Sequence, residues 1–434
     1  MDSLQAILRG GFEDFRDFVN PLIYNRAELA REPVRLLQAR DGHLVDEDGH
    51  PVEDLHGTQA FGHRHPYVTR AVRDFLESDA PNWFPSRVNP FAGRLARRLC
   101  ERSGHYSSVY FGCSGADAVE ASLKLCRAAT RRPRLLCLER AYHGCTFGAV
   151  SLMHRGPFTE PFRPLLPGAL CLPFGDADAL SRALSEGDVA AVVVEPVQGE
   201  GGVRTLPDGY LAALCELTAR HGALLVADEV QSGMGRSGYF LRSATWPRRP
   251  DVALLAKQLG GGLAPISAML TTRELFARAY GADFEDGESH NMTMSYNALS
   301  CVAALASLDL LTEDLLGAVR DRGEAFRARC HQRLQGHALY RDTRAAGYMF
   351  GVELRQPEHP WVGFDQFGWP DLEDRATIGP LTAYRLYRRG WFAFVCGHDW
   401  SILRMQPRLT LEPEHLDRLI THLGEELDAL AELV

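Results

Sequence analysis

The sequence predicts an α/β fold in which a mainly parallel sheet is covered by helices on both faces. Short apolar runs alternate with amphipathic stretches from about residue 60 to residue 310. Short apolar runs between turn residues are typical of buried strands, and apolar residues at helical spacing indicate helices. Strands that alternate with helices in this way favour a parallel sheet. With 434 residues, the chain can form about two or three domains with a sizeable core.

The elements are predicted in the following order. A helix over residues 3–19 precedes a hairpin whose turn is 46–49 (DEDG), because these polar residues separate two apolar pairs. Buried strands are then predicted at 109–111, 135–138, 189–194, 223–227, 252–256 and 266–270, with helices between them, notably at 116–129 and 210–221. Helices over 298–311 and 315–334 lead into a smaller α+β region. Its predicted parts are a strand at 346–354 and a loop insertion at 356–379.

Composition and charge exclude several classes of protein. The net charge is -9 and no basic run is present, which argues against binding to nucleic acid. The ten cysteines show neither a C-x-x-C pair nor a Cys/His zinc pattern, so we expect no metal site and a reducing cytoplasm. The sequence starts without a signal-peptide pattern, and no apolar run approaches the ~20 residues of a membrane span. These features predict a cytoplasmic protein.

Lysine is almost absent from the chain. Only Lys124 and Lys257 occur, against forty-five arginines. Arginine can replace lysine on a surface, but guanidinium does not lose its proton in proteins and so cannot attack a carbonyl. Lys257, in 256–262 (AKQLGGG), is therefore a candidate nucleophile. The alternative is a solvated surface lysine, and the motifs around it decide between the two.

Two motifs at predicted strand ends suit a phosphorylated ring. Ligands collect at the carboxyl ends of strands in open α/β sheets. Residues 111–120 (FGCSGADAVE) run through a turn of small residues into a helix, whose first N–H groups suit a phosphate. Small turns before helices are common, so this motif alone does not decide. Tyr142, in 140–146 (RAYHGCT), either stacks on a flat ligand or joins the core.

Two further strand ends carry acidic residues. Asp228 and Glu229 end a very apolar strand, where a carboxylate is costly unless a cation or donor pairs with it. A protonated pyridine nitrogen would be such a partner, and its charge makes the ring an electron sink. A helix N-cap or a structural salt bridge is the alternative. Glu195 and Glu200 lie in 194–202 (VEPVQGEGG), which indicates a ligand-facing loop, although charged loops after strands are common.

Together these motifs resemble the class III pyridoxal-phosphate aminotransferases. The motifs around Asp228 and Lys257, 29 residues apart, are highly specific as a pair. The resemblance covers nearly the whole chain, from 62–66 (GHRHP) to 403–407 (LRMQP). The motifs that carry it are, in order, Ser114-Gly115, Tyr142-His143-Gly144, Glu195-Pro196, 228–233 (DEVQSG) and Lys257.

The resemblance implies a role for each matching residue. Lys257 would form a Schiff base with pyridoxal phosphate and then act as the acid/base for proton transfer. Asp228 corresponds to the carboxylate that pairs with the pyridinium nitrogen. Tyr142 and Val230 correspond to the residues on the two ring faces, and Gln231 to the neighbour of the ring hydroxyl. The remaining cofactor-binding residues that the family implies are Ser114, Gly115 and Ala116 in the phosphate cup, Glu195 in a supporting shell, and His143.

The resemblance also implies an assembly and a domain plan. Thr293 corresponds to a threonine that reaches the phosphate of the partner subunit, so we expect a homodimer with shared active sites. The implied architecture is fold type I, with a mainly parallel seven-stranded-type sheet and a smaller α+β domain built from the N- and C-terminal segments. We expect residues 1–58 to belong to the small domain, 59–312 to form the cofactor-binding domain, and 313–434 to complete the small domain.

The substrate side of the site is predicted from three residues. In ornithine- and acetylornithine-type members, the position of Arg404 binds the α-carboxylate, and the position of Glu200 covers it when a distal amino group reacts. A structural ion pair is the alternative for these two. Phe84, beside Trp83, is expected at an entrance that suits an apolar or extended amine. Cys145 stands where relatives that use 2-oxoglutarate often carry arginine, which leaves alanine/pyruvate or another pair open.

These residues predict an aminotransferase. It would move an amino group from an amine or ω-amino acid to a 2-oxo acid by a ping-pong mechanism through the Lys257 Schiff base. A decarboxylase, racemase or aminomutase remains open, because the same lysine and aspartate serve those reactions. A non-catalytic binding module with an arginine-rich surface is the alternative from another class. The net charge and the complete set of cofactor motifs count against it.

Overall fold

The computed structural model describes residues 3–29, 35–40, 42–153, 156, 158–281, 289–358 and 374–433. The chain forms two compact units. The first comprises Met1–His65, Glu324–Ala345 and Phe350–Val434, and the second comprises Pro66–Gly323 and Ala346–Met349. The domain boundaries expected after residues 58 and 312 remain predictions. No helix in the described part of the chain combines the length and the hydrophobicity needed to cross a membrane.

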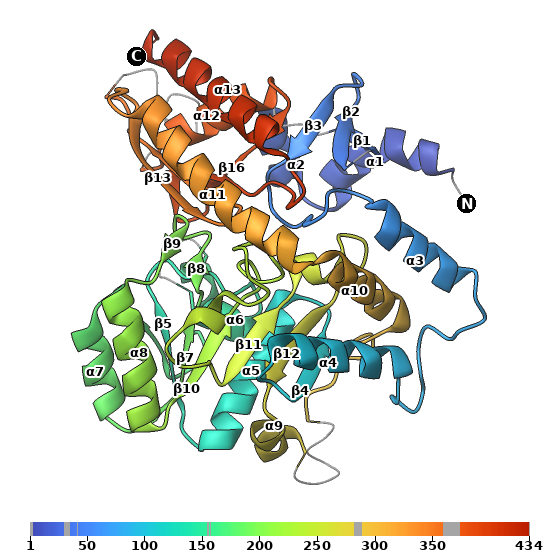
Figure 1. The fold of residues 1–434 in the computed structure, drawn as a ribbon, viewed down its shortest axis with the longest axis vertical. Helices are drawn as coiled ribbons and strands as arrows, with labels where there is room; N and C mark the ends of the chain where they lie inside the picture. Colours follow the sequence, from blue (N-terminus) through green and yellow to red (C-terminus); the bar gives the residue numbers. More distant parts are fainter. Residues whose placement is uncertain are drawn as a thin grey trace. The chain divides into compact units, whose positions relative to one another are not determined.

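A seven-stranded sheet forms the centre of the second unit (Figure 1), which confirms the predicted α/β class. The strand order is β4-β12-β11-β10-β7-β5-β6. The last five of these run parallel, and β12 is antiparallel to both β11 and β4. The strands are β4 (Ser108–Gly112), β5 (Arg134–Leu138), β6 (Ala169–Leu172), β7 (Val189–Val194), β10 (Leu224–Asp228), β11 (Val252–Leu255) and β12 (Ser267–Thr271).

Helices bury both faces of this sheet, with α5 on one face and the neighbouring α7 and α8 on the other (Figure 1). Side chains alternate between the faces along each strand. Val193 and Val226 pack with α5, whereas Leu225 and Ala227 pack with α7 and α8. The helices of this unit are α3 (Pro66–Leu76), α4 (Pro90–Ser103), α5 (Gly115–Thr130), α6 (Phe147–Ser151), α7 (Ala177–Ser185), α8 (Asp208–His221), α9 (Arg273–Tyr280) and α10 (Ala298–Leu310).

Shorter elements complete the second unit. A two-stranded sheet pairs β8 with β9, and single 3-10 turns follow several strands. These elements are β8 (Val197–Gln198), β9 (Arg204–Thr205), η1 (Glu160–Phe162), η2 (Arg242–Thr245) and η3 (Lys257–Gly260). The long helix α11 (Glu313–Leu334) contains the change from the second unit to the first.

The first unit holds two four-stranded sheets, ordered β1-β2-β3-β15 and β13-β14-β17-β16. Its C-terminal helix places Leu416, Leu419, Leu423 and Leu427 on one buried face, at the spacing of successive helical turns. Its elements are α1 (Leu4–Phe18), α2 (Pro21–Leu29), β1 (Leu36–Arg40), β2 (His43–Asp46), β3 (Pro51–Asp54), β13 (Tyr340–Ala346), β14 (Met349–Leu354), α12 (Ile378–Tyr387), β15 (Trp391–Phe392), β16 (Phe394–Cys396), β17 (Asp399–Met405) and α13 (Pro413–Ala431).

The structure corrects three sequence-based expectations. The strand predicted over 346–354 is present as β14 but begins only at Met349, because Gly347 has a left-handed φ of 57° and turns the chain between β13 and β14. Strand β6 was not predicted, since its short ALCL run is largely unburied at the edge of the sheet. Most of the loop predicted at 356–379 lies outside the described residues, and α12 already begins at Ile378.

Candidate active site

The candidate active site lies where several strands of the large sheet end. Strands β7, β10 and β11 are parallel, so their carboxyl ends meet at one edge. A Cβ atom added to Gly115 would lie 2.9 Å from Val230 Cγ1 and 3.6 Å from Ala256 Cβ. The first turn of α5, the loop after β10 and the end of β11 therefore converge. This edge is where open α/β sheets bind their ligands.

The start of α5 is organised by a capping box. The Ser114 hydroxyl accepts a hydrogen bond from the Asp117 amide at 3.2 Å, and the Asp117 carboxylate accepts from the amides of Cys113 and Ser114 at 2.9 Å each. The amides of Gly115 and Ala116 are not used by this box. They belong to the first turn, where N–H groups and the helix dipole favour an anion. The turn can therefore hold a phosphate group.

Asp228 forms a buried ion pair with His143. The aspartate is the last residue of β10 and is 4% exposed. His143 Nδ1 donates to Asp228 Oδ2 at 2.7 Å, and the Val230 amide donates to Asp228 Oδ1 at 3.1 Å. Burial lowers the pKa of His143, but the hydrogen bond to Asp228 and its negative charge outweigh burial and raise that pKa. Asp228 therefore favours the charged form of His143.

Glu195 lies beside this pair, directly after β7. It is 5% exposed and accepts from the Tyr142 amide at 2.9 Å and from the Gly199 amide at 3.4 Å. Burial raises the pKa of Glu195 to about 7, although the positive charges of His143 and Lys257 act to lower it. The acidic motifs after β7 and β10 and the lysine after β11 thus share one electrostatic environment.

Lys257 occupies a strained backbone position. It begins η3 directly after the end of β11, and its φ is 42°. A non-glycine residue in the left-handed region costs about 1–2 kcal/mol, and such strain is found at active sites and ligand clamps more often than elsewhere. The fold thus holds this lysine in an unfavourable conformation at the ligand-binding edge of the sheet.

The whole chain compares well with one enzyme family. The model of the Aminotransferase class-III family matches residues 25–427.

This chain belongs to the class III aminotransferases.

Solved structures agree with this assignment. An ornithine aminotransferase from Toxoplasma gondii is 25% identical, with 100% of this chain and 99% of that chain covered and a TM-score of 0.83. An amine transaminase from an uncultivated Pseudomonas species is 27% identical over 91% and 94% of the two chains, with a TM-score of 0.79. A transaminase with L-alanine is 25% identical over 92% and 100%, with a TM-score of 0.82.

Class III aminotransferases depend on pyridoxal phosphate and have fold type I, and the residues of this site fit that cofactor. The first turn of α5 would bind the phosphate of the cofactor, and the buried carboxylate of Asp228 would pair with its protonated pyridine nitrogen. The primary amine of Lys257 would react with its aldehyde carbon. The Nε2 atom of His143 is buried without a hydrogen-bond partner among the described residues. The polar network beside Asp228 is thus incomplete in the protein alone, as expected where a ligand binds.

The other predicted residues lie in three different places. Gln231 is buried and approaches Gly199 so closely that a Cβ there would overlap its amide, and Glu200 is half-buried in the turn between β8 and β9. Phe84 and Thr293 line a separate cavity of the second unit. The remaining residue belongs to the first unit, where Arg404 on β17 is 5% exposed and donates to the His56 carbonyl at 3.2 Å.

Sequence reasoning missed the side chains that hold these loops in place. Glu229 is fully buried and accepts from the Ser243 amide and the Ser232 hydroxyl, both at 2.6 Å. Arg236 is also fully buried, and its backbone carbonyl accepts from the Tyr348 amide at 2.9 Å. A charged residue directly after a very apolar strand indicates a functional or structural role. Both Asp228 and Glu229 show this pattern, so the sequence does not distinguish them. Only their hydrogen-bond partners separate the two.

Proposed function

We propose that this aminotransferase transfers an amino group from an amine or ω-amino acid to a 2-oxo acid in two half-reactions of a ping-pong cycle. The observation that carries the proposal is the convergence of three strand-end segments. Val230, two residues after Asp228, and Ala256, the residue before Lys257, both lie against Gly115 at the anion-binding start of α5. When bound, pyridoxal phosphate supplies an electrophilic carbonyl and a ring that withdraws electrons. The protein supplies orientation, charge and a movable proton.

We assign the protein side of this chemistry to four residues. The Lys257 amine would be the covalent attachment point of the cofactor, and it would move the proton from the amino-bearing carbon of the substrate to the aldehyde-derived carbon of the cofactor. Asp228 would accept a hydrogen bond from the ring nitrogen of the bound cofactor and favour the protonated form of that nitrogen. His143 orients Asp228, since its Nδ1–H occupies Oδ2 at 2.7 Å and leaves the remaining lone pairs to the ligand. Tyr142, anchored to Glu195 through its amide, covers one ring face.

The acceptor we propose is a small 2-oxo acid such as pyruvate. Cys145 stands 3.2 Å from the Tyr142 hydroxyl through its Sγ atom, and Glu200 adds a negative charge near that hydroxyl. A distal carboxylate would meet the like charge of Glu200 on this side. A related transaminase was solved with L-alanine, the amino acid that corresponds to pyruvate. Arg404 is proposed to bind the α-carboxylate of one substrate, and Glu200 to cover Arg404 when a distal amino group of the other substrate reacts.

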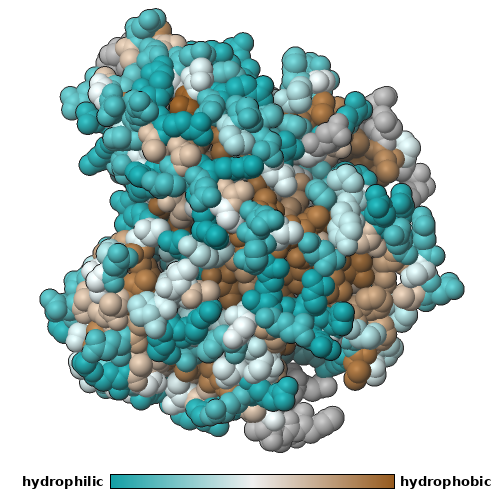
Figure 2. Space-filling model, in the orientation of Figure 1, coloured by the Kyte–Doolittle hydropathy of each residue, from teal (hydrophilic) through white to brown (hydrophobic). Residues whose placement is uncertain are grey.

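We also propose a homodimer. Several large apolar side chains are exposed on the second unit, among them Leu76 at 65%, Trp83 at 46% and Val88 at 79%. Figure 2 shows apolar residues gathered on the visible face of that unit. Exposed apolar patches on this scale mark interaction surfaces, and self-association is the commonest way to cover them. Thr293, in the proposed role, would reach the cofactor phosphate of the partner subunit.

Substitution of the two lysines tests the function. Lys257→Ala should lower the rate of amino transfer from L-alanine by a factor of about 10⁴ or more, because both the attachment point and the proton carrier are lost. The absorbance of the lysine-bound cofactor should disappear as well. Lys124→Ala is the matched control, since this exposed α5 lysine donates to the Ser289 carbonyl at 2.6 Å and has no proposed catalytic part.

The kinetics distinguish transamination from its relatives. Wild-type protein mixed with L-alanine alone should release pyruvate once, with a change in cofactor absorbance and no further turnover until a 2-oxo acid is added. Continued turnover without an acceptor, or release of CO₂, would instead establish another reaction on this cofactor. Lys257→Ala protein that transferred amino groups at the wild-type rate would contradict the proposal.

A further inference from the structure

The segment that carries Tyr142 is held at both of its ends by a carboxylate from another part of the second unit. At its start, the Tyr142 amide donates to Glu195 Oε1 at 2.9 Å. At its end, the Glu120 side chain of α5 accepts hydrogen bonds from the first residues of the short helix α6. We call residues 142–149 the cover segment. The site as described above does not include Glu120.

One oxygen of Glu120 accepts three hydrogen bonds. Its Oε1 atom receives the Thr146 hydroxyl at 2.5 Å, the Gly148 amide at 2.8 Å and the Ala149 amide at 3.3 Å. The first amides of a helix have no partner within that helix and need an acceptor from elsewhere, usually the N-cap side chain. Thr146, at the N-cap position of α6, makes no capping bond and donates its hydroxyl to Glu120 instead. Glu120 therefore replaces the N-cap and ties α6 to α5.

Two glycines let the cover segment lie directly against α5. A Cβ atom on Gly144 would lie 2.7 Å from Ala116 Cβ. A Cβ atom on Gly148 would overlap the carboxylate of Glu120. Gly144 also has a φ of 120°, which residues with a side chain rarely adopt. The cover segment thus contacts the first turn of α5 at Ala116 and the second turn at Glu120.

These contacts connect two parts of the cofactor site. The first turn of α5 is proposed to bind the phosphate, and Tyr142 is proposed to cover the ring. Glu195 fixes the start of the cover segment, and Phe158 meets the Tyr142 ring edge-on with centroids 6.1 Å apart. Glu120 fixes the other end of the segment to the helix that begins with the phosphate-binding turn. The distance between the phosphate-binding turn and the ring cover is therefore set by Glu120.

We propose that Glu120 is a positioning residue for the cofactor. It holds the cover segment on α5, so that Tyr142 covers the ring of a cofactor whose phosphate lies at the start of the same helix. The inference rests on the proposed function, which assigns the ring face to Tyr142 and the phosphate to α5. Glu120 acts through the start of α6 and needs no contact with the reacting atoms.

Cofactor binding, measured without any amino donor, tests this inference. Glu120→Ala removes all three hydrogen bonds and should raise the dissociation constant of pyridoxal phosphate about 10- to 100-fold. The circular dichroism of the cofactor should also weaken at saturating cofactor, because the ring is no longer held in one orientation. Inorganic phosphate, titrated by calorimetry into the cofactor-free protein, should keep its dissociation constant, since the first turn of α5 is intact. A role limited to folding would not separate the two ligands.

Two further variants separate the geometry of the acceptor from its charge. Glu120→Gln keeps an acceptor oxygen at the same reach and should restore the cofactor dissociation constant to near the wild-type value. Thr146→Val removes one of the three donors and should raise that constant about 3- to 10-fold. This variant tests the inference even where Glu120→Ala does not fold. Glu101→Ala, which removes an exposed carboxylate of α4 paired with Arg97, is the matched control and should change nothing.

Several results would overturn the inference. Glu120→Ala protein with wild-type cofactor affinity and dichroism would do so, as would an equal loss of phosphate and cofactor affinity. Glu120→Gln protein that binds the cofactor as weakly as Glu120→Ala, or unchanged cofactor binding by Thr146→Val, would also contradict it. Wild-type protein that binds the cofactor but transfers no amino group would contradict the proposed function and leave the positioning role standing.

Discussion

Adjacent carboxylates can have different functions when their partners differ. Asp228 faces the side of the sheet covered by α5 and accepts from His143, a partner 85 residues earlier in the chain. Glu229 turns away and accepts from Ser232 and Ser243 within its own loop. The alternation of side chains at a strand end separates them, since neighbouring residues point to opposite faces. The first is available to a ligand, and the second fixes the loop.

Glu195 gives the site a pH dependence that can be measured as stability. A glutamate in an unfolded chain has its usual pKa of 4.5, whereas burial raises the pKa of Glu195 to about 7 in the folded protein. Its neutral form is therefore favoured by folding, and this stability is present below about pH 4.5 and lost as the pH rises through about 7. Relative to wild type, Glu195→Gln should thus gain up to about 3 kcal/mol of unfolding free energy across that range.

Urea unfolding of the cofactor-free proteins between about pH 5 and about pH 8 checks this expectation. Glu216→Gln, which replaces an exposed carboxylate of α8, is the matched control. A constant difference between Glu195→Gln and wild type over the whole range would contradict a buried, neutral Glu195.

At the residue scale, sequence reasoning located the strand-end groups but not their bonds. Tyr142 and Glu195 were both predicted near the cofactor, yet the hydrogen bond from the Tyr142 amide to the glutamate was not. The left-handed backbone conformation of Lys257 was not predicted from the sequence either. Such features arise from contacts between distant segments, and neither local periodicity nor residue type encodes them. The cofactor roles of the individual residues remain predictions.

At the scale of elements, the hairpin between β13 and β14 packs against the loop that follows Asp228. A Cβ on Gly347 would overlap the carbonyl carbon of Ser237, and the φ of 57° adds conformational strain. Gly347→Ala should therefore lower the free energy of unfolding by about 2–5 kcal/mol, of which about 1–2 comes from φ and about 1–3 from overlap.

Gly336 provides the matched comparison for this substitution. It also has a left-handed φ, 83°, but no atom lies within 4 Å of an added Cβ. Gly336→Ala should lower the free energy of unfolding by only about 1–2 kcal/mol, the cost of a left-handed φ at alanine. Denaturant unfolding measures both variants, and equal losses would show that the overlap at Gly347 is relieved by a small shift of the loop.

Elements with strong periodicity were predicted well. The apolar runs of β7 and β10 were placed within one residue, because strands buried on both faces are almost entirely apolar. The edge strand β6 was missed, since its pattern of exposure lacks that signal. Residues 346–354 were predicted as one strand because a single glycine in a largely apolar run is compatible with a strand or with a turn. In the structure, Gly347 lies in a turn.

At the scale of the whole molecule, the proposed dimer accounts for apolar side chains that a single chain leaves in water. Val88→Asp would place a charge in the interface, where its desolvation is costly, and should shift the protein toward the 48.2 kDa monomer. Analytical ultracentrifugation of wild type should give twice that mass. Leu170→Asp, on the edge strand β6 and 41% exposed, is the control. A monomeric wild type would contradict the dimer.

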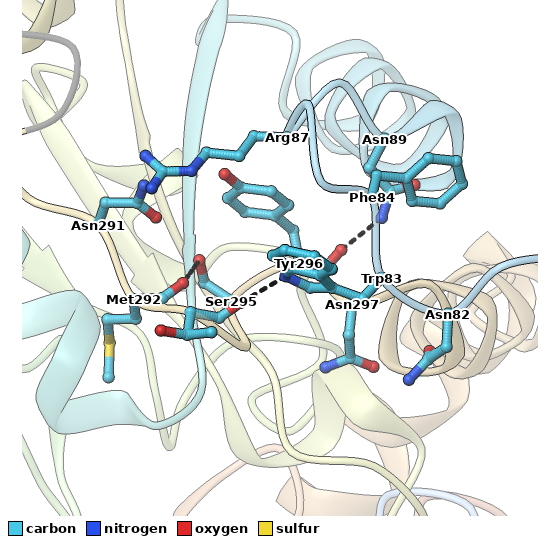
Figure 3. A pocket seen from close by; sticks show the side chains of 11 residues that line it. Asn82, Trp83, Phe84, Arg87, Asn89, Asn291, Met292, Ser295, Tyr296 and Asn297 are labelled. Atoms are coloured by element: carbon cyan, nitrogen blue, oxygen red, sulfur yellow. Dashed lines mark hydrogen bonds between the residues drawn. The ribbon is translucent and has the colours of Figure 1, made fainter.

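The fold class and the enzyme family were both predictable for the whole chain. Strand–helix alternation predicted the sheet, and the resemblance of the motifs around Asp228 and Lys257 indicated the family, which the match over residues 25–427 confirms. The cavity lined by Phe84 and Thr293 was not predicted (Figure 3). Both residues were named as site candidates, but their segments are about 200 residues apart in the sequence and no pattern predicts that they share one cavity. Only their pairing through Asn89 and Trp83 creates it.

The scarcity of lysine also limits the reaction of this enzyme's surface with free aldehydes. Pyridoxal phosphate is an aldehyde that condenses with exposed primary amines on any protein surface. Here the surface cations are guanidinium groups, which stay protonated and do not react in this way. The chain has one lysine besides Lys257. This is Lys124, whose side-chain amine donates a hydrogen bond to the Ser289 carbonyl. An enzyme with this composition is almost inert toward excess of its own cofactor everywhere except at the active site.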